Sequence, residues 1–231
     1  YDDGERFAFF SKAILEAIKY MGDFKPDIIH CNDWQSAVVP LLLKDKYSED
    51  VLYNNIKSVF TIHNLQYQGI VPKWSLYDLL NLDWKYYNEN EMKFYDCISF
   101  MKGGIVFADA ITTVSKTYAK EIQTPFYGER LDGLLSSRAS NLYGIVNGID
   151  YEIYNPKVDE KIFYNYDMKD IKQKVKNKLK LQEKLGLTVN KDIPLIGIVT
   201  RLVKQKGLDL IVEKLQELLS LPIQIVLLGN G

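Results

Sequence analysis

Short apolar runs of strand type alternate along this chain with longer segments of helical spacing. The strand-like runs are residues 27–31, 58–62, 110–114, 142–146 and 195–199. Short apolar runs bounded by polar residues are typical of buried strands, whereas apolar residues three or four apart are typical of helices. No hairpin dipeptide joins two strands of alternating pattern, which favours helical crossovers between parallel strands. The pattern therefore predicts an α/β fold built on parallel sheets.

Helices are expected between these strands. The predicted helices are residues 5–21, 36–44, 90–107, 118–122, 131–138 and 170–185, followed by one that starts at Leu208. Ser115 is expected to cap the fourth of these, and the pair Gly103 and Gly104 predicts close packing of the third. Residues 70–90 are rich in aromatic side chains and are expected to be irregular.

The chain divides within residues 151–192, which we interpret as a connector. Residues 1–150 hold four of the predicted strands, and residues 193–231 open a second sheet. The chain begins without an initiator methionine and ends in a glycine turn just after a strand, where an α/β sheet would be incomplete. We therefore expect a piece of a longer enzyme, with both sheets truncated.

Composition excludes several classes of protein. The formal net charge of -1 gives no general attraction to nucleic acid or to membranes. Two cysteines and two histidines provide neither a disulfide framework nor a metal cluster, and Cys31 and His30 are interpreted as structural. No apolar stretch is long enough to span a bilayer, so a cytoplasmic setting is expected.

Polar residues follow each predicted strand at once or within two or three positions. They are Asp33, His63, Ser115, Asn147 and Arg201. Each has a structural alternative: Asp33 as a helix cap, His63 as a core histidine, Asn147 as part of an Asn-Gly turn. In parallel sheets the carboxyl ends of the strands share one edge, so the five residues together predict one binding crevice.

The last of these residues lies in a basic loop. Arg201, Lys204 and Lys206 stand between the strand at 195–199 and the helix that starts at Leu208. Guanidinium and ammonium groups beside the positive end of a helix bind phosphate oxygens, although the alternative is a loop of ordinary solvated cations. The six lysines of the helix at 170–185 are interpreted as a solvated face.

Several motifs of known chemistry are missing. The chain has no G-x-S-x-G elbow, no P-loop and no D-x-D sequence. A diphosphate would therefore be neutralised by arginine and lysine rather than by a metal ion, and no cofactor is expected.

Five segments carry a resemblance to a known family. They are H-C-N-D-W at 30–34, F-T-I-H-N-L-Q-Y-Q-G at 60–69, I-T-T-V-S at 111–115, Y-G-I-V-N-G-I-D at 143–150 and T-R-L-V-K-Q-K-G-L-D at 200–209. The chain resembles bacterial glycogen synthases and plant starch synthases over essentially its whole length. These retaining enzymes transfer glucose from ADP-glucose to the non-reducing end of an α-1,4-glucan such as glycogen.

The resemblance implies two Rossmann-like domains of the glycosyltransferase-B type. Residues 1–150 would belong to the N-terminal, acceptor-side catalytic domain, and residues 193–231 to the C-terminal domain that binds the nucleotide sugar. The family's K-T-G-G-L loop and its later E-P-C-G-L motif are not in this sequence, which implies that the 231-residue piece is inactive alone.

The resemblance also implies roles for particular residues. Arg201 and Lys206 would bind the diphosphate and offset the charge on departing ADP, His63 would lie over the reacting sugar, and Asp33 would stand beside it. The residues expected to bind or shape the substrate are Asn64, Tyr67, Gln68 and Asn147. Because the retaining glycosidase scheme needs a carboxylate nucleophile and none is evident, front-face attack is the preferred hypothesis.

Two alternatives remain open on the sequence. The chain could belong to another retaining two-domain glycosyltransferase, of the sucrose synthase or phosphorylase type. It could also be a non-catalytic glucan-binding piece that uses the aromatic residues between 74 and 87, whereas Trp34 is interpreted as packing rather than as a sugar platform.

Overall fold

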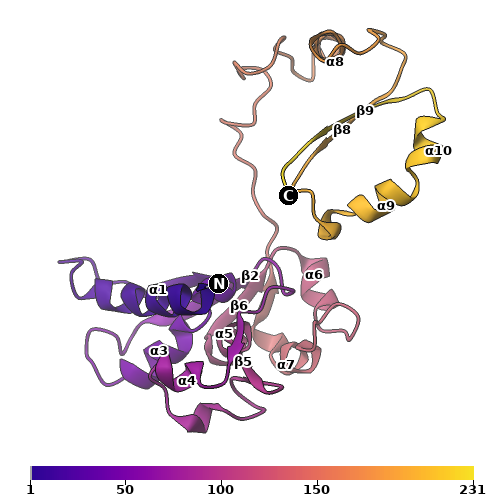
Figure 1. Ribbon diagram of the computed structural model, residues 1–231. Coiled ribbons are helices and arrows are strands. Elements are labelled where there is room, and N and C mark those ends of the chain that lie inside the picture. Colours follow the sequence, from indigo (N-terminus) through magenta and orange to yellow (C-terminus); the bar gives the residue numbers. More distant parts are fainter. Residues whose placement is uncertain (1) are drawn as a thin grey trace. The chain divides into compact units, whose positions relative to one another are not determined.

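A computed structural model describes residues 2–231 (Figure 1). The chain separates into two compact units, one reaching to Gly148 and the other spanning Ile149–Gly231. No helix among the described residues is both long and apolar enough to cross a membrane.

A four-stranded parallel sheet forms the centre of the first unit. Its strands are β1 (Ile28–Asn32), β2 (Lys57–Ile62), β6 (Ala110–Thr113) and β7 (Leu142–Gly144), in the order β1-β2-β6-β7. Cys31, Phe60, Ile111 and Leu142 stand in register across the four strands and are all buried. These four side chains lie on the same face of the sheet. The burial of Cys31 confirms that it is a core residue. Burial also raises the pKa of the Cys31 thiol to about 12, so it stays protonated.

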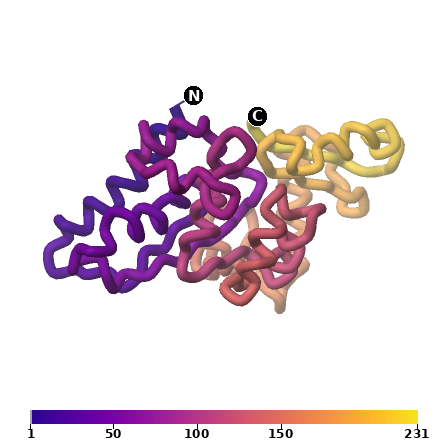
Figure 2. Tube along the Cα trace, turned by 90° about the horizontal axis from the view of Figure 1, so that it is seen from below, coloured from indigo at the N-terminus to yellow at the C-terminus, as the bar shows by residue number. Residues whose placement is uncertain are grey.

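Helices cover this buried face. They are α1 (Asp3–Ile18), α2 (Asp33–Ser36), α3 (Val39–Lys46) and α5 (Phe100–Phe107). A Cβ atom added to Gly104 would lie 2.8 Å from the ring of Phe60 and 3.0 Å from Cβ of Ala37, so the predicted close approach is confirmed. Helix α1 lies alongside the segment that follows β2 (Figures 1 and 2), where Lys12 donates a hydrogen bond to the carbonyl of Leu79.

The helix predicted at 36–44 is found as α3, but it starts later than predicted and a separate short helix, α2, precedes it. Helix α2 ends at Ser36 and α3 begins at Val39, with Pro40 in its first turn. Proline has no N–H to donate and suits the first turn of a helix rather than its interior, so the chain restarts there.

The helix predicted at 90–107 is wrong over its first half. Residues 93–99 form an antiparallel hairpin of β4 (Lys93–Phe94) and β5 (Cys97–Ser99), and β5 also pairs with β3 (Ile70–Pro72). Tyr95 turns the hairpin with φ of 55°, a left-handed conformation that ends any helix. Helix α5 begins only after Ser99, whose hydroxyl accepts a hydrogen bond from the backbone N–H of Lys102.

The remaining elements of the first unit are short. Those not yet given are α4 (Ser75–Asp78), the 3-10 turns η1 (Trp84–Tyr86) and η2 (Ala139–Asn141), and helices α6 (Lys116–Glu121) and α7 (Asp132–Ser137). The segment predicted as irregular at 70–90 therefore contains short elements. The predicted cap is confirmed, because the Ser115 hydroxyl accepts from the N–H of Tyr118 at 2.8 Å.

The second unit has one parallel strand pair. Strands β8 (Leu195–Val199) and β9 (Gln224–Leu228) pair in register, with α8 (Gln173–Lys184), the turn η3 (Lys204–Lys206), α9 (Leu208–Glu213) and α10 (Leu215–Leu219) around them. The helix predicted from Leu208 is broken at Lys214. The lysines of α8 are largely exposed, as expected, and Gln182 is the only buried side chain among residues 149–231.

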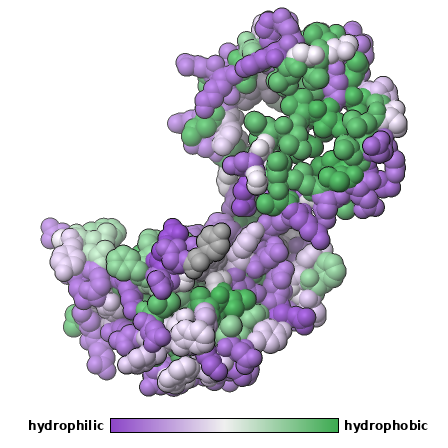
Figure 3. Space-filling model, viewed as in Figure 1, coloured by the Kyte–Doolittle hydropathy of each residue, from purple (hydrophilic) through white to green (hydrophobic). Residues whose placement is uncertain are grey.

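Apolar side chains of this second unit remain accessible. Figure 3 shows them gathered over the strands and helices of the unit. A cavity of about 830 Å³ lies between α8 and the strands, lined by residues such as Val175, Leu181, Ile198 and Val226. Protein interiors are normally packed without such voids, so residues 149–231 do not close a core of their own.

Candidate functional site

The ends of β1 and β2 bring Asp33 and His63 together. The carboxylate oxygen Oδ1 of Asp33 accepts hydrogen bonds from the backbone N–H of His63 at 2.8 Å and of Asn64 at 3.3 Å. Asp33 itself has φ of 53°, which costs less for Asp than for most residues. The N-cap residue of α2 is Asn32, so Asp33 is not the cap of this helix. The structural task of Asp33 is therefore to anchor the loop of residues 63–69, hereafter the 63–69 loop.

The imidazole of His63 is exposed and oriented by the preceding strand. Its Nε2 lies 2.9 Å from Oδ1 of Asn32. An amide oxygen only accepts hydrogen bonds, so Nε2 is the donor of this contact, which fixes the orientation of the ring. His63 is consequently not a core histidine. His30 is also exposed, and its Nε2 lies 2.6 Å from Oγ1 of Thr61 on the neighbouring strand.

The 63–69 loop is also held at its far end. Gly69 has φ of 59°, and a Cβ atom there would lie 2.2 Å from the ring of Trp34. Trp34 in turn packs edge-on against Phe7 at 4.9 Å, so its predicted packing role is confirmed. Only glycine fits this close approach with a left-handed backbone.

Gln68 lies inside the protein rather than in an open pocket. Its side chain is 6% exposed, and its amide nitrogen donates to the carbonyl of Glu129 at 2.9 Å. Ser99 donates to the carbonyl oxygen of Gln68 as well. The neighbouring Tyr67 is exposed. Within the loop, Tyr67 is thus available to a ligand, whereas Gln68 fixes the loop's shape.

Tyr118 supports the middle of the 63–69 loop. Its hydroxyl accepts a hydrogen bond from the backbone N–H of Leu65 at 3.3 Å. Burial raises the pKa of this hydroxyl, the bond from Leu65 opposes the rise, and the negative charges of Glu129 and Asp33 add to it. The group therefore stays a phenol with a proton to donate.

Two residues that support the 63–69 loop were not predicted from the sequence. Asn32 orients His63, and Tyr118 supports Leu65. Asn32 could have been predicted, since it is the last residue of its strand and precedes Asp33. Tyr118 lies on α6, more than fifty residues from the loop it contacts, and no local pattern marks that contact.

The second unit carries the basic loop of Arg201, Lys204 and Lys206. Arg201 follows β8, and Lys206 closes η3 before Gly207, whose φ of 74° leads into α9. Both basic side chains are exposed. The backbone around Arg201 is fixed by bonds from Thr200 N–H to Leu228 and from Leu202 N–H to Asn230.

A shallow hollow of about 420 Å³ marks the carboxyl ends of β8 and β9. It is lined by Thr200, Gly229 and Asn230 among others. A Cβ atom on Gly229 would lie 2.0 Å from the carbonyl oxygen of Thr200, so glycine is required for the two strand ends to meet. This is the edge at which open α/β sheets bind ligands.

Asn147 stands apart from the contacts just described. It lies three residues beyond β7 and is exposed. No cluster of three or more metal-ligating His, Cys, Asp or Glu side chains occurs within residues 2–231. In the first unit, then, the structure joins Asp33 with His63 and Asn64, and Tyr67 and Gln68 share their loop.

Known proteins match this chain along its whole length. The model of the starch synthase catalytic domain matches residues 1–137. The glycogen synthase of Clostridium acetobutylicum is 60% identical over 231 residues, and that of Clostridium novyi 56% over 230; each match covers all of this chain and 48% of the relative. The chain therefore spans about half the length of the curated relatives it matches.

A solved structure agrees with the architecture. The catalytic domain of starch synthase IV from Arabidopsis thaliana, bound to ADP and acarbose, superposes with a TM-score of 0.91 at 38% identity. The match covers 99% of this chain and 47% of that one. The predicted α/β class of the glycosyltransferase-B type is thereby confirmed, and with the family-model match we conclude that the chain belongs to the starch synthase catalytic domain family.

Proposed function

We propose that this protein is a glycogen (starch) synthase, a hexosyltransferase that moves glucose from ADP-glucose to the non-reducing end of an α-1,4-glucan with retention of configuration. The observation that carries the proposal is the 60% identity to a glycogen synthase over every residue of the chain. The starch synthase structure that binds ADP and acarbose supports the same donor nucleotide and a glucan-like acceptor.

On the donor side, Arg201 and Lys206 hold the diphosphate. Arginine forks onto two phosphate oxygens and lysine supplies a compact charge. Because both groups are cations on a braced loop at the end of β8, they offset the charge that grows on ADP as the glycosidic bond breaks. No metal ion is needed for this step.

On the sugar side, His63 and Asp33 act at the reacting glucose. Oδ1 of Asp33 already accepts hydrogen bonds from two backbone N–H groups, which makes this oxygen a weaker nucleophile. The charge instead stabilises the cationic transition state or the acceptor. This supports front-face attack by the acceptor hydroxyl, with the leaving phosphate taking its proton, over a covalent glycosyl-enzyme.

The remaining substrate contacts are assigned by exposure. Asn64, Tyr67 and Asn147 bind glucose units or the phosphate directly, whereas Gln68 holds the loop that carries them. Residues 1–150 form the acceptor-side part, residues 151–192 the connector and residues 193–231 the nucleotide-sugar side. We expect the enzyme to work in the cytoplasm on ADP-glucose and glycogen.

The proposal is tested by following incorporation of labelled glucose from ADP-glucose into glycogen by the complete protein. His63→Ala and Arg201→Ala should each lower kcat by roughly 10²–10³-fold, since each removes a group that acts in the transition state. Lys204→Ala is the matched control, because it removes an exposed cation from the same turn as Lys206 and should leave kcat within about twofold. Preference for a donor other than ADP-glucose, or unchanged kcat in the first two variants, would refute the assignment.

A further inference from the structure

Side chains hold the start of the 63–69 loop by its backbone. Oδ1 of Asp33 accepts hydrogen bonds from the N–H groups of His63 and Asn64, at 2.8 and 3.3 Å. The next N–H group, that of Leu65, donates to the hydroxyl of Tyr118 at 3.3 Å. Three consecutive N–H groups are therefore held by two side chains that lie far apart in the sequence, one on α2 after β1 and the other on α6 after β6.

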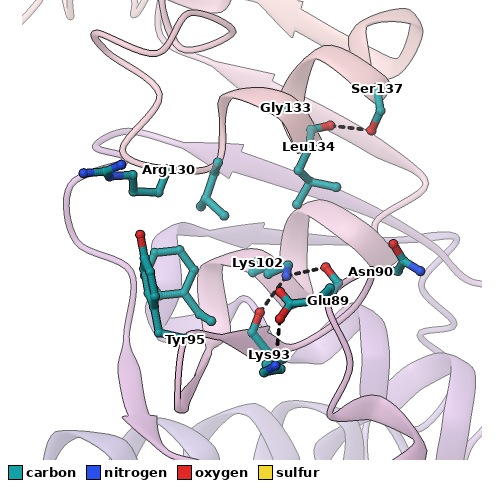
Figure 4. A pocket seen from close by; sticks show the side chains of 11 residues that line it. Glu89, Asn90, Lys93, Tyr95, Lys102, Arg130, Gly133, Leu134 and Ser137 are labelled. Atoms are coloured by element: carbon teal, nitrogen blue, oxygen red, sulfur yellow. Dashed lines mark hydrogen bonds and ion pairs between the residues drawn. The ribbon is translucent and has the colours of Figure 1, made fainter.

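The far end of the loop is held by other contacts. The first two residues of α5 donate backbone hydrogen bonds to the carbonyls of Gly69 and Gln68, at 3.2 and 3.0 Å. The start of α5 is itself linked to the segment before it, because Nζ of the buried Lys102 donates to the carbonyls of Glu89 and Lys93, both at 2.6 Å (Figure 4). These bonds do not involve α6, so this end of the loop should stay in place when α6 is changed.

Gln68 links the same end of the loop to a strained turn. Its amide nitrogen donates to the carbonyl of Glu129 at 2.9 Å, and Glu129 and Arg130 are both left-handed, with φ of 49° and 69°. Strain of this kind persists where the surrounding structure fixes it. The part of the loop that remains is its middle, around Leu65.

Leu65 depends on the acceptor that Tyr118 provides. The Leu65 side chain is fully buried, which limits how far its backbone can move toward water, and the ring of Tyr118 packs against the same apolar core. A donor that loses its acceptor in such a place costs more than the bond itself contributes. Without the Tyr118 hydroxyl, the backbone at Leu65 should therefore shift, two residues from His63.

We propose that Tyr118 is a positioning residue of the proposed transferase site, which fixes His63 through the backbone N–H of Leu65. The inference rests on the proposed function, since it gives Tyr118 an effect on the reaction that passes through His63. At the end of β6 the sequence predicts Ser115 as the polar residue of the binding crevice. Ser115 caps α6 instead, and the bond that it accepts from the N–H of Tyr118 fixes the turn of helix that carries the phenol.

The test is a double-mutant cycle on glucose transfer by the complete protein, with Tyr118→Phe, His63→Ala and both changes together. Phenylalanine keeps the ring in the core and removes only the hydroxyl. Tyr118→Phe should lower kcat roughly tenfold, because the reacting groups are misplaced, and leave KM for ADP-glucose and for glycogen within about twofold. In the His63→Ala background the same change should lower kcat by less than about twofold, because the group that Tyr118 positions is already absent.

Tyr53→Phe is the matched control. The hydroxyl of Tyr53 also bonds to the backbone, donating to the carbonyl of Leu15 at 2.8 Å inside the core of the same unit, and this bond is not in the 63–69 loop. Its removal should lower the midpoint of thermal unfolding, as the loss of any buried hydrogen bond does, and leave kcat within about twofold.

A second measurement does not depend on activity. Deuterium uptake by peptides that contain residues 63–69 should be faster in Tyr118→Phe than in the parent and unchanged in Tyr53→Phe, since exchange reports local opening.

Unchanged kcat or unchanged deuterium uptake in Tyr118→Phe would overturn the inference. A loss of kcat as large in the His63→Ala background as in the parent would do so too, because Tyr118 would then act independently of His63. In each of these cases the transferase assignment would stand. If His63→Ala itself left kcat unchanged, the proposed role of His63 would fail and the inference with it.

Discussion

Asp33 combines two tasks in one side chain. Its Oδ1 accepts hydrogen bonds from the backbone of the first two residues of the 63–69 loop. Its carboxylate therefore lies next to His63. The two tasks can be separated, because asparagine keeps an oxygen acceptor and also tolerates a left-handed backbone.

We therefore expect Asp33→Asn to fold normally and to lose activity. Its midpoint of thermal unfolding should stay within a few degrees of the parent, since the hydrogen bonds persist and are weakened by only about 1 kcal/mol. The kcat for glucose transfer should fall by roughly 10²-fold, because the neutral amide cannot stabilise a developing positive charge. If kcat were unchanged while the melting temperature fell sharply, Asp33 would be a structural anchor alone.

At this scale the sequence correctly predicted that the polar residues at the ends of β1 and β2 meet, whereas Asn147 stands apart from them. Asp33, His63 and Asn64 are found in contact because parallel strands end at one edge. Gln68 could not be placed correctly, because its burial depends on the carbonyl of Glu129, sixty-one residues away. A side chain's partner across the fold leaves no trace in local spacing.

Among the elements, α5 and the hairpin before it show where periodicity misleads. Apolar residues between 90 and 107 are compatible with a helix, but the left-handed turn at Tyr95 and the cap at Ser99 divide the segment. The half that is helical behaves as expected. Gly104 lets α5 approach β2 closely enough to bury Phe60 completely, whereas Gly103 packs against Met92.

Gly104→Ala should therefore destabilise the protein by about 1–3 kcal/mol, the usual cost of forcing extra atoms into a packed core. The added methyl group would press on Phe60 and Ala37. Gly133→Ala is the matched control on α7, where a Cβ atom meets nothing within 4 Å; it should be neutral or stabilise by about 0.4–1 kcal/mol. Denaturant unfolding of both variants gives the comparison, and equal stabilities would contradict the packing described for α5.

Over the whole molecule, the apolar core is confined to the first unit. Every buried hydrophobic side chain of the described chain lies between Ala8 and Leu142. The sequence predicted the strands of both units, since each is a short apolar run. It did not predict that the strands of the second unit would stay uncovered, because burial depends on what packs against them.

Limited proteolysis of the 231-residue chain should expose this difference. We expect protease to cut first within residues 149–231, leaving a resistant piece that ends near Gly148, since segments with few buried contacts open most readily. Mass spectrometry of the products identifies the cleavage sites over time. Protection of residues 195–228 equal to that of the parallel sheet in the first unit would show that the second unit is independently stable.

The side-chain amide of Gln68 hydrogen-bonds the carbonyl of Glu129. This bond links two segments that lie far apart in the chain, the 63–69 loop and the left-handed turn at Glu129. Replacing only one of the two segments with that of a distant relative would leave a buried donor or acceptor without its hydrogen-bond partner. Chimaeric enzymes built from this family should accordingly exchange both segments as a pair, and insertions in one will be accommodated only with matching changes in the other.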